Sequence, residues 1–136
     1  MSELNLEIIT PEKPIFRDQI EAVTIPGTQG SFQILKNHAP LISSFEIGII
    51  KVQKSNVETF YTTAGGTVEV SKNQVLVLAD SIEKITDINV DRAEQAKKRA
   101  EDRLQKKHEE NIDEARANAA LNRALNRLNA VKKYNA

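Results

Sequence analysis

The stretch INVDRAEQAKKRAEDRL, residues 88–104, decides how this chain divides. It begins a run from Val90 to Tyr134 that contains neither glycine nor proline and consists mainly of Ala, Arg, Lys, Glu, Asn and Leu. Those residues favour helix. All glycines and prolines lie at or before Gly66, among β-branched residues that favour strands. The sequence therefore predicts a sheet domain at residues 1–86 and a helical domain at residues 87–136.

Short apolar or alternating runs fill the first domain, and each run is closed by residues typical of turns. Their close spacing favours an antiparallel β-sandwich or barrel over a parallel sheet. Ser71-Lys-Asn73 has the length of a compact hairpin connection. The expected strands are residues 4–9, 20–25, 31–35, 46–52, 57–63, 66–70 and 74–79.

Small apolar residues recur at helical spacing in two segments of the second domain. The first segment can be capped by Asn89 or Asp91, and the second by Asp113, after a polar connection at residues 108–113. We therefore expect an antiparallel two-helix hairpin, which makes the whole chain an α+β protein. The apolar positions are Ala93, Ala96, Ala100 and Leu104, then Ala117, Ala120, Leu121, Ala124, Leu125, Leu128 and Val131.

The seam of this hairpin is expected to be weak because it consists mainly of alanine. Burial of one methylene contributes only about 0.8 kcal/mol, whereas a whole Leu or Val side chain contributes about 1.5–3 kcal/mol. If the hairpin opened into one continuous helix, about fifty residues at ~1.5 Å each would extend roughly 75 Å. The sequence thus permits a change between a folded and an extended form.

Several classes of function are disfavoured by composition and motifs. With Cys at 0 and His at 2, a zinc cluster would need mostly carboxylate ligands. The pairs at Gly65-Gly66 and Gly27–Gly30 match neither a P-loop nor a dinucleotide fingerprint, so we expect turns there. His38 precedes Ala39-Pro40 without an evident nucleophile, which indicates a shaped loop with a hydrogen-bonded imidazole. We expect no catalytic residue and no metal.

The start of the sequence lacks a basic region followed by an apolar core, and no apolar run approaches the ~20 residues of a membrane span. We therefore expect a soluble chain that stays in the compartment where it is made.

Charge is distributed unevenly although the net charge is +0. Residues 1–86 carry 7 Lys/Arg and 10 Asp/Glu, while residues 87–136 carry 12 and 9. No acid follows Glu114, so the last helix is cationic and would be attracted to an acidic surface. Its basic residues are Arg116, Arg123, Arg127, Lys132 and Lys133.

An ordered series of motifs runs along the chain: Val23-Thr-Ile-Pro-Gly27, Gly30, Ile34-Leu35, His38-Ala-Pro-Leu41, Gly48, Gly65-Gly66, Glu69-Val70 and Val75-Leu-Val-Leu-Ala-Asp80. This series resembles the epsilon subunit of bacterial F-type ATP synthase. The resemblance covers nearly the whole chain, since that family also ends in a two-helix hairpin. Its most specific part is the block from Pro26-Gly27 to His38-Ala-Pro-Leu41.

The resemblance implies a non-catalytic rotor subunit that couples the gamma subunit to the membrane c-ring during proton-driven ATP synthesis. In that family the sandwich docks on gamma and on the c-ring, and the loops at that base would be Gln29, Gly30 and Ser31 together with His38, Ala39 and Pro40. The extended helix would present the basic residues Arg116, Arg123, Arg127, Lys132 and Lys133 to acidic segments of the catalytic beta subunits, within the alpha/beta head, and so inhibit ATP hydrolysis. The expected location is the cytoplasmic face of a bacterial membrane, reached only through the complex, with the plastid stroma as the alternative.

Some bacterial members of this family bind ATP between hairpin and sandwich through a motif resembling Ile-Asp-x-x-Arg-Ala. This chain has Ile88-Asn-Val-Asp-Arg-Ala93, in which Asn89 cannot supply a carboxylate. No cofactor is required, and ATP stays open as a regulatory ligand with weakened affinity. By this resemblance the candidate ligands are Glu83, Asn89, Arg92, Arg99, Arg123 and Arg127.

Two other functions stay open beside the rotor subunit. In one, the same fold acts mainly as an ATP sensor through its hairpin. In the other, the basic helix binds nucleic acid with steep salt dependence. We rank the latter last because the helices contain no aromatic residue before Tyr134 on which a base could stack.

Overall fold

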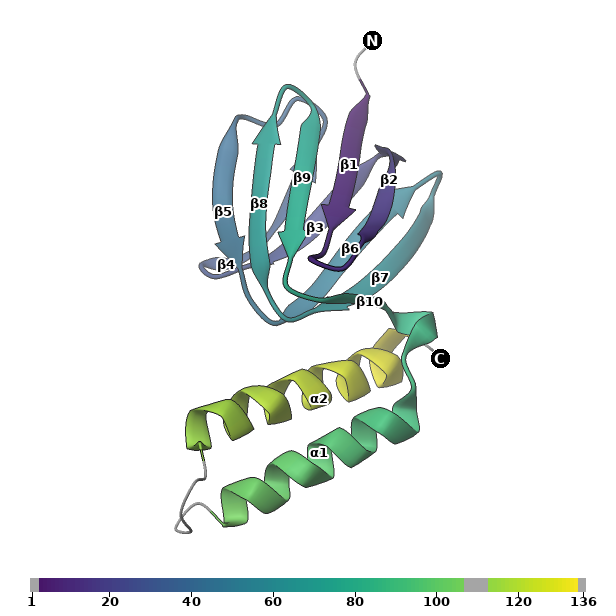
Figure 1. Ribbon diagram of the computed structural model, residues 1–136. Helices are drawn as coiled ribbons and strands as arrows, with labels where there is room; N and C mark the ends of the chain where they lie inside the picture. The colour runs from purple at the N-terminus through teal and green to yellow at the C-terminus, as the bar shows by residue number, and fades with distance from the viewer. Residues whose placement is uncertain (1–2, 107–112, 135–136) are drawn as a thin grey trace. The chain divides into compact units, whose positions relative to one another are not determined.

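The computed structural model describes residues 3–106 and 113–134 (Figure 1). The chain divides into two compact units, Met1–Lys84 and Ile85–Ala136. The first unit consists of strands, and the second consists of a 3₁₀ turn and two α-helices. The expected α+β fold is confirmed. None of the helices in the described part of the chain is long and apolar enough to cross a membrane.

Ten strands form the first unit. They follow the order β10-β7-β6-β3-β5-β8-β9-β1-β2, with β4 paired to β3. All pairings are antiparallel except that of β1 with β9. Figure 1 shows β5, β8, β9, β1 and β2 in one layer, with β3, β4, β6 and β7 behind them. The bounds are β1 Leu4–Ile9, β2 Pro14–Ile20, β3 Ala22–Gly27, β4 Gly30–Leu35, β5 Leu41–Phe45, β6 Gly48–Lys54, β7 Val57–Thr63, β8 Gly66–Ser71, β9 Gln74–Ala79 and β10 Ile82–Lys84.

Three strands lie outside the sequence expectation, and the expected strands at residues 20–25 and 46–52 are each displaced by two residues from β3 and β6. The run at residues 20–25 is divided between β2, which ends at Ile20, and β3, which begins at Ala22. The sequence does not predict β2 because Arg17, Asp18 and Gln19 interrupt its apolar pattern, and β2 lies at the edge of the sheet. Strand β5 has Ser43 and Ser44 in its middle, and β10 has only 3 residues. Such strands carry too little periodicity to be recognised.

Alternate residues of the strands point into the space between the two layers. On β1, Leu4, Leu6 and Ile8 are each at most 1% exposed. Each fully buried aliphatic side chain of this kind contributes about 1.5–3 kcal/mol. The core is therefore aliphatic, and its largest fully buried members are Leu4, Leu6, Ile8, Ile25, Ile34, Ile50, Val23, Val52, Val68, Val70 and Val77.

The two ends of the sandwich are built from different turn residues. At one end, which we call the glycine end, the strand termini and the connection from β7 to β8 carry all five glycines of the chain: Gly27, Gly30, Gly48, Gly65 and Gly66. The opposite end, which we call the asparagine end, carries the positive-φ residues that are not glycine: Asn37, Ser55, Asn56, Lys72 and Asn73. The asparagine end joins β4 to β5, β6 to β7 and β8 to β9.

The second unit contains η1 at Ile85–Asp87, α1 at Val90–Gln105 and α2 at Glu114–Tyr134. Of the two expected caps for α1, Asn89 is the one used, since its Oδ1 accepts a hydrogen bond from the Arg92 backbone N–H at 3.0 Å. Asp113 caps α2 in the same way, through the Arg116 N–H at 3.0 Å. Most of the expected connection at 108–113 lies outside the described residues.

The helices α1 and α2 run antiparallel along each other, as Figure 1 shows. The buried residues of both helices are all alanine: Ala93 and Ala100 on α1, and Ala117, Ala124 and Ala130 on α2. Leu104, Leu121, Leu125 and Leu128 are only half-buried. The expected alanine seam is present, and η1 adds the buried Ile85 beside α2.

Candidate functional site

The arginines of the two helices share one edge of the hairpin. On α1 they are Arg92, Arg99 and Arg103, and on α2 they are Arg116, Arg123 and Arg127. Both sets follow the same spacing of seven and then four residues, which keeps each set on one face of its helix. We call these six residues the arginine edge.

The two faces meet on the same side of the hairpin. Arg92 and Arg99 each precede a buried alanine of α1, and Arg116 and Arg123 each precede a buried alanine of α2. A residue one position before a buried alanine points about 100° away from the seam. Because the two helices are antiparallel, the residues before the buried alanines of both helices point to the same edge of the hairpin. Arg92, Arg99, Arg103 and Arg116 are exposed, whereas Arg123 and Arg127 are half-buried. A long row of guanidinium groups results.

Guanidinium groups are suited to phosphate and carboxylate oxygens, which they can bind in a bidentate manner. Of the expected ATP ligands, four lie on the arginine edge: Arg92, Arg99, Arg123 and Arg127. Arg103 and Arg116 were not included in that set, although the repeated Arg-Ala dipeptides and the shared spacing were visible in the sequence. Glu83 lies half-buried in β10, in the other unit.

Asn89 stands at the start of α1, and its side-chain oxygen is engaged by the cap. The Asn89 side chain thus caps α1 as an aspartate side chain would at this position. Asp91 is exposed in the first turn of α1.

The other edge of α1 has mixed charge. A shallow hollow there is lined by Glu94, Gln95, Lys97, Lys98 and Glu101. Opposite charges three or four residues apart compensate one another on such a surface. This side of α1 therefore combines both signs of charge, whereas the six residues of the arginine edge are all cationic.

The end of α2 carries the remaining cations of the expected inhibitory set. Lys132 and Lys133 are exposed in the last turn, and Lys133 Nζ lies 5.2 Å from the centre of the Tyr134 ring. Cations at a helix C-terminus are favoured by the helix dipole. Part of this charge therefore stabilises α2 itself.

The two expected docking loops lie at opposite ends of the sandwich, which corrects the expectation that they face one base. Gln29, Gly30 and Ser31 belong to the glycine end, while His38, Ala39 and Pro40 belong to the asparagine end. Strand β4 runs from Gly30 to Leu35 between them. At ~3.3 Å per residue it separates the loops by about 16 Å.

The loop at residues 36–40 has a defined shape. The His38 backbone N–H donates to the Leu35 carbonyl at 3.2 Å, and Nδ1 of the same residue donates to the Ala39 carbonyl at 2.7 Å. The interpretation of His38 as a hydrogen-bonded residue of a shaped loop is confirmed.

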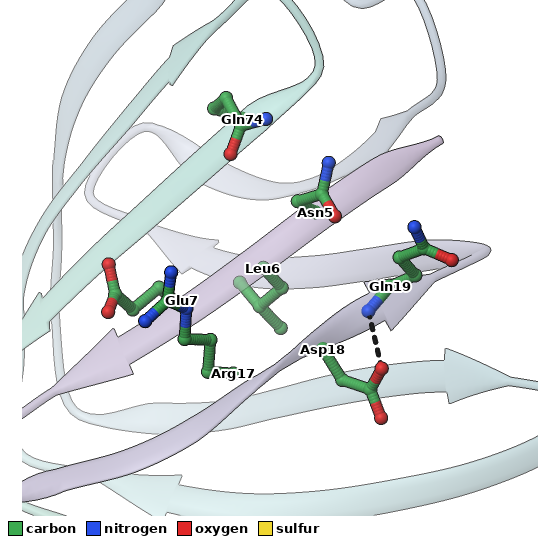
Figure 2. A pocket seen from close by; sticks show the side chains of 7 residues that line it. All are labelled: Asn5, Leu6, Glu7, Arg17, Asp18, Gln19 and Gln74. Carbon is green, nitrogen blue, oxygen red and sulfur yellow. Dashed lines mark hydrogen bonds between the residues drawn. The ribbon is translucent and has the colours of Figure 1, made fainter. Parts of the chain in front are cut away.

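A polar recess is lined by residues of β1, β2 and β9, and Figure 2 shows their side chains. Glu7 stands opposite Arg17 in the register of β1 and β2, and Asn5 stands opposite Gln19. Asp18 accepts hydrogen bonds from Lys54 of β6 and from the Gln19 N–H, the latter at 2.8 Å. These bonds, that from Lys54 above all, hold the pKa of the Asp18 carboxyl below its ordinary value.

The recess does not assemble a reactive set. Within residues 3–106 and 113–134, no group of three or more His, Asp or Glu side chains is placed to hold a metal ion. The Asp18–Lys54 pair joins β2 to β6 and so connects the two layers of the sandwich. Its role is structural.

Comparison with known proteins matches both units. The family model for the ATP synthase Delta/Epsilon chain beta-sandwich domain matches residues 3–85, and the model for the long alpha-helix domain of the same chain matches residues 86–132. The chain belongs to the delta/epsilon family of ATP synthase subunits.

Its curated relatives place it more closely, since they are epsilon chains. The ATP synthase epsilon chain of Symbiobacterium thermophilum is 46% identical over 131 residues, which cover 96% of this chain and 94% of the relative. That of Desulforamulus reducens is 42% identical and covers 93% of this chain and 96% of the relative. The resemblance to the epsilon subunit is thereby confirmed.

Solved structures share the fold at low identity. A chain in the mitochondrial ATP synthase of Euglena gracilis (OSCP/F1/c-ring) superposes with a TM-score of 0.83 at 18% identity, covering 96% of this chain and 82% of that chain. A chain of the central stalk and c-ring of the Tetrahymena thermophila enzyme gives 0.57 at 16% identity, covering 63% and 69%.

Proposed function

We propose that this chain is a non-catalytic subunit of the central stalk of an F-type ATP synthase. In this role the β-sandwich docks on the gamma subunit and the c-ring and couples them during proton-driven synthesis. The helical unit restrains ATP hydrolysis in the alpha/beta head. Family membership over both units supports the rotor role.

The arginine edge is the observation that carries the inhibitory part of the proposal. Six guanidinium groups lie on one side of two helices whose buried seam consists of alanine. An acidic segment of a partner could exchange the hairpin contact for ion pairs at little cost, because the seam stabilises the hairpin weakly. Opening of the hairpin would carry the cations of α2 toward the head.

The proposed place of action is the cytoplasmic face of a bacterial membrane, and the plastid stroma is the alternative. The chain would reach the membrane only by binding the other subunits. The epsilon-chain relatives are bacterial, which supports the first location.

The rotor role is tested by titration of the purified full chain with the isolated gamma subunit of an F-type complex. We expect saturable binding with one chain per gamma. Retention of this binding when Arg123 and Arg127 are both changed to Gln would assign it to the sandwich. A full chain that shows no binding to gamma at micromolar concentration would contradict the proposal.

ATP is proposed as a regulatory ligand of the same hairpin. Arg92, Arg99, Arg123 and Arg127 lie on one edge and could bind phosphate oxygens. A ligand at a hundredfold excess over its dissociation constant stabilises the bound form by about 2.7 kcal/mol. That is large beside the contribution of an alanine seam, so ATP would hold the hairpin folded.

Calorimetric titration of ATP, with ADP as the control ligand, tests this regulatory role. Arg99→Gln should weaken binding, whereas Lys98→Gln, one residue away on another side of α1, should not. If both variants lose affinity equally, the interaction is unspecific attraction of an anion to a basic helix. If the wild-type chain binds no ATP at millimolar concentration, switching depends on the other subunits alone.

A further inference from the structure

One asparagine side chain joins two turns at the asparagine end. Asn73, in the β8–β9 turn, is only 9% exposed. Its Oδ1 accepts a hydrogen bond from the Asn37 backbone N–H at 2.6 Å, and its Nδ2 donates to Asn37 Oδ1 at 3.2 Å. A polar side chain at the tip of a hairpin is ordinarily exposed. Here it is turned inward toward the neighbouring loop.

The backbone of Asn73 also holds the start of β1. Its carbonyl accepts a hydrogen bond from the Asn5 N–H at 2.9 Å. Three segments that are distant in sequence therefore meet at this residue: the start of β1, the turn of β8 and β9, and the loop after β4. Asn73 thus connects the loop at residues 36–40 to the sheet.

The loop at residues 36–40 depends on this residue for its position. Within the described residues, both hydrogen bonds that join residues 36–40 to a distant segment end on the Asn73 side chain. The bonds of His38 to Leu35 and Ala39 shape the loop internally but do not attach it to the sheet.

We propose that Asn73 is a positioning residue that holds residues 36–40 in a conformation ready to bind the gamma subunit. This inference rests on the proposed docking of the sandwich on gamma. Lys36, Asn37, Ala39 and Pro40 are exposed, so the loop presents most of its surface for contact. A loop that is ordered before binding loses less conformational entropy on association, which raises affinity.

The turn geometry supplies a substitution that removes the anchor and keeps the hairpin. Lys72 and Asn73 have φ of 50° and 62°, and positive φ at both central residues is the type I′ geometry, which accepts glycine at the second position. Asn73→Gly therefore keeps the turn and deletes both side-chain hydrogen bonds. The expected result is exchange of the Asn37 amide hydrogen about tenfold faster or more in the isolated full chain.

The β6–β7 turn provides a matched control. Ser55 and Asn56 have φ of 52° and 64°, and Asn56 engages the rest of the sandwich by its backbone N–H, which donates to Glu21 Oε1 at 3.1 Å. Asn56→Gly makes the same chemical change at the same end without removing that bond. It should leave the Asn37 exchange rate and the affinity for gamma unchanged.

The binding measurement then separates the inference from the function on which it rests. We expect Asn73→Gly to bind gamma about tenfold more weakly than wild type, with the difference mainly in the association rate. Equal affinity of Asn73→Gly and Asn56→Gly, or an unchanged exchange rate at Asn37, would overturn the inference while the rotor role stands. Absence of wild-type binding to gamma would overturn the rotor role, whatever the exchange rates show.

A second variant keeps the test decisive if Asn73→Gly does not fold. Asn37 has a φ of 66°, so Asn37→Gly keeps the loop backbone while removing the Oδ1 acceptor. It should weaken binding to gamma by less than tenfold relative to the wild-type chain, because the 2.6 Å bond from its backbone N–H is retained. A loss of affinity without any change in amide exchange at residues 37 and 38 would contradict the positioning role.

Discussion

Oδ1 of Asn89 lies 3.0 Å from the backbone nitrogen of Arg92, so one member of the candidate ATP motif caps the helix that carries the next. A contact of ATP with this oxygen, as proposed for the motif, would therefore compete with the cap. A change at Asn89 has to be analysed for both.

Asn89→Asp should preserve the cap and add a negative charge at the N-terminus of α1. The helix dipole favours that charge by about 0.3–1 kcal/mol at low salt. Asn89→Ala removes the cap and should destabilise the helical unit by about 1 kcal/mol. Thermal unfolding followed by circular dichroism measures both effects, and calorimetry should show tighter ATP binding for Asn89→Asp. Equal stability of the two variants would contradict the role of the cap.

The alanine seam predicts that a larger side chain will open the hairpin. Ala124 is 0% exposed, and replacement of its methyl group by the isobutyl side chain of leucine should cost about 1–3 kcal/mol through overpacking. Ala124→Leu should shift the hairpin toward the extended form, whereas Asn122→Leu, at an exposed position of the same helix, should not.

Paired spin labels can report this opening, since the chain has Cys at 0. Labels at Glu94→Cys and Lys132→Cys would be about 57 Å apart along one continuous helix, whereas the packing of α1 against α2 keeps the two positions closer together in the folded hairpin. A distance distribution unaffected by Ala124→Leu would show that the seam tolerates the larger residue.

Gly66 allows the close approach of β8 and β9 at the glycine end. A Cβ at this position would overlap the Leu78 carbonyl oxygen and would lie 2.9 Å from the Ala79 Cα. Because both obstacles are backbone atoms, Gly66→Ala should destabilise the sandwich by about 1–3 kcal/mol. Thr67→Ala, an exposed neighbour on the same strand, serves as the control in urea unfolding. Equal urea midpoints for Gly66→Ala and Thr67→Ala would show that β8 and β9 can move apart without loss of stability.

The Asp18–Lys54 pair predicts a small acid-dependent loss of stability. The pKa of Asp18 is lowered in the folded chain, first by its hydrogen bond with Lys54. Its contribution is therefore complete above the unfolded value of about 3.9 and is lost as the pH falls through the lower folded pKa. Both side chains are nearly half exposed, so the effect at neutral pH is small.

In Asp18→Asn the free energy of unfolding should accordingly depend less on pH below about pH 4 than in wild type, with little change at pH 7. Glu58→Gln offers a comparison, since Glu58 pairs with Lys51 across β6 and β7 at 3.2 Å. If the free energy of unfolding falls equally in Asp18→Asn and in wild type below about pH 4, the lowered pKa of Asp18 does not contribute to stability.

Local pattern was sufficient for much of the fold. Residues 57–63 and 74–79 were predicted with the bounds of β7 and β9, because apolar residues there are framed by turn residues. Asp113 was recognised as a cap because a cap acts within three residues of itself. The alanine seam was visible for the same reason, since helical spacing is a property of the local sequence.

The remaining features depend on which segments become neighbours. The separation of the Gln29 and His38 loops follows from the direction of β4, which residue types do not reveal. The bond between Asn37 and Asn73 spans 36 residues, and either asparagine alone is an ordinary turn residue. The arginine edge needed the antiparallel arrangement of α1 and α2 before its two halves formed one surface.

The most direct test adds the full chain to an F-type ATP synthase complex that lacks its epsilon subunit and follows ATP hydrolysis. We predict that the wild-type chain binds stoichiometrically and lowers the hydrolysis rate. A chain in which Arg116, Arg123 and Arg127 are changed to Gln and Lys132 and Lys133 to Gln should bind equally and inhibit less. A wild-type chain that neither binds the complex nor changes its hydrolysis rate would contradict the account.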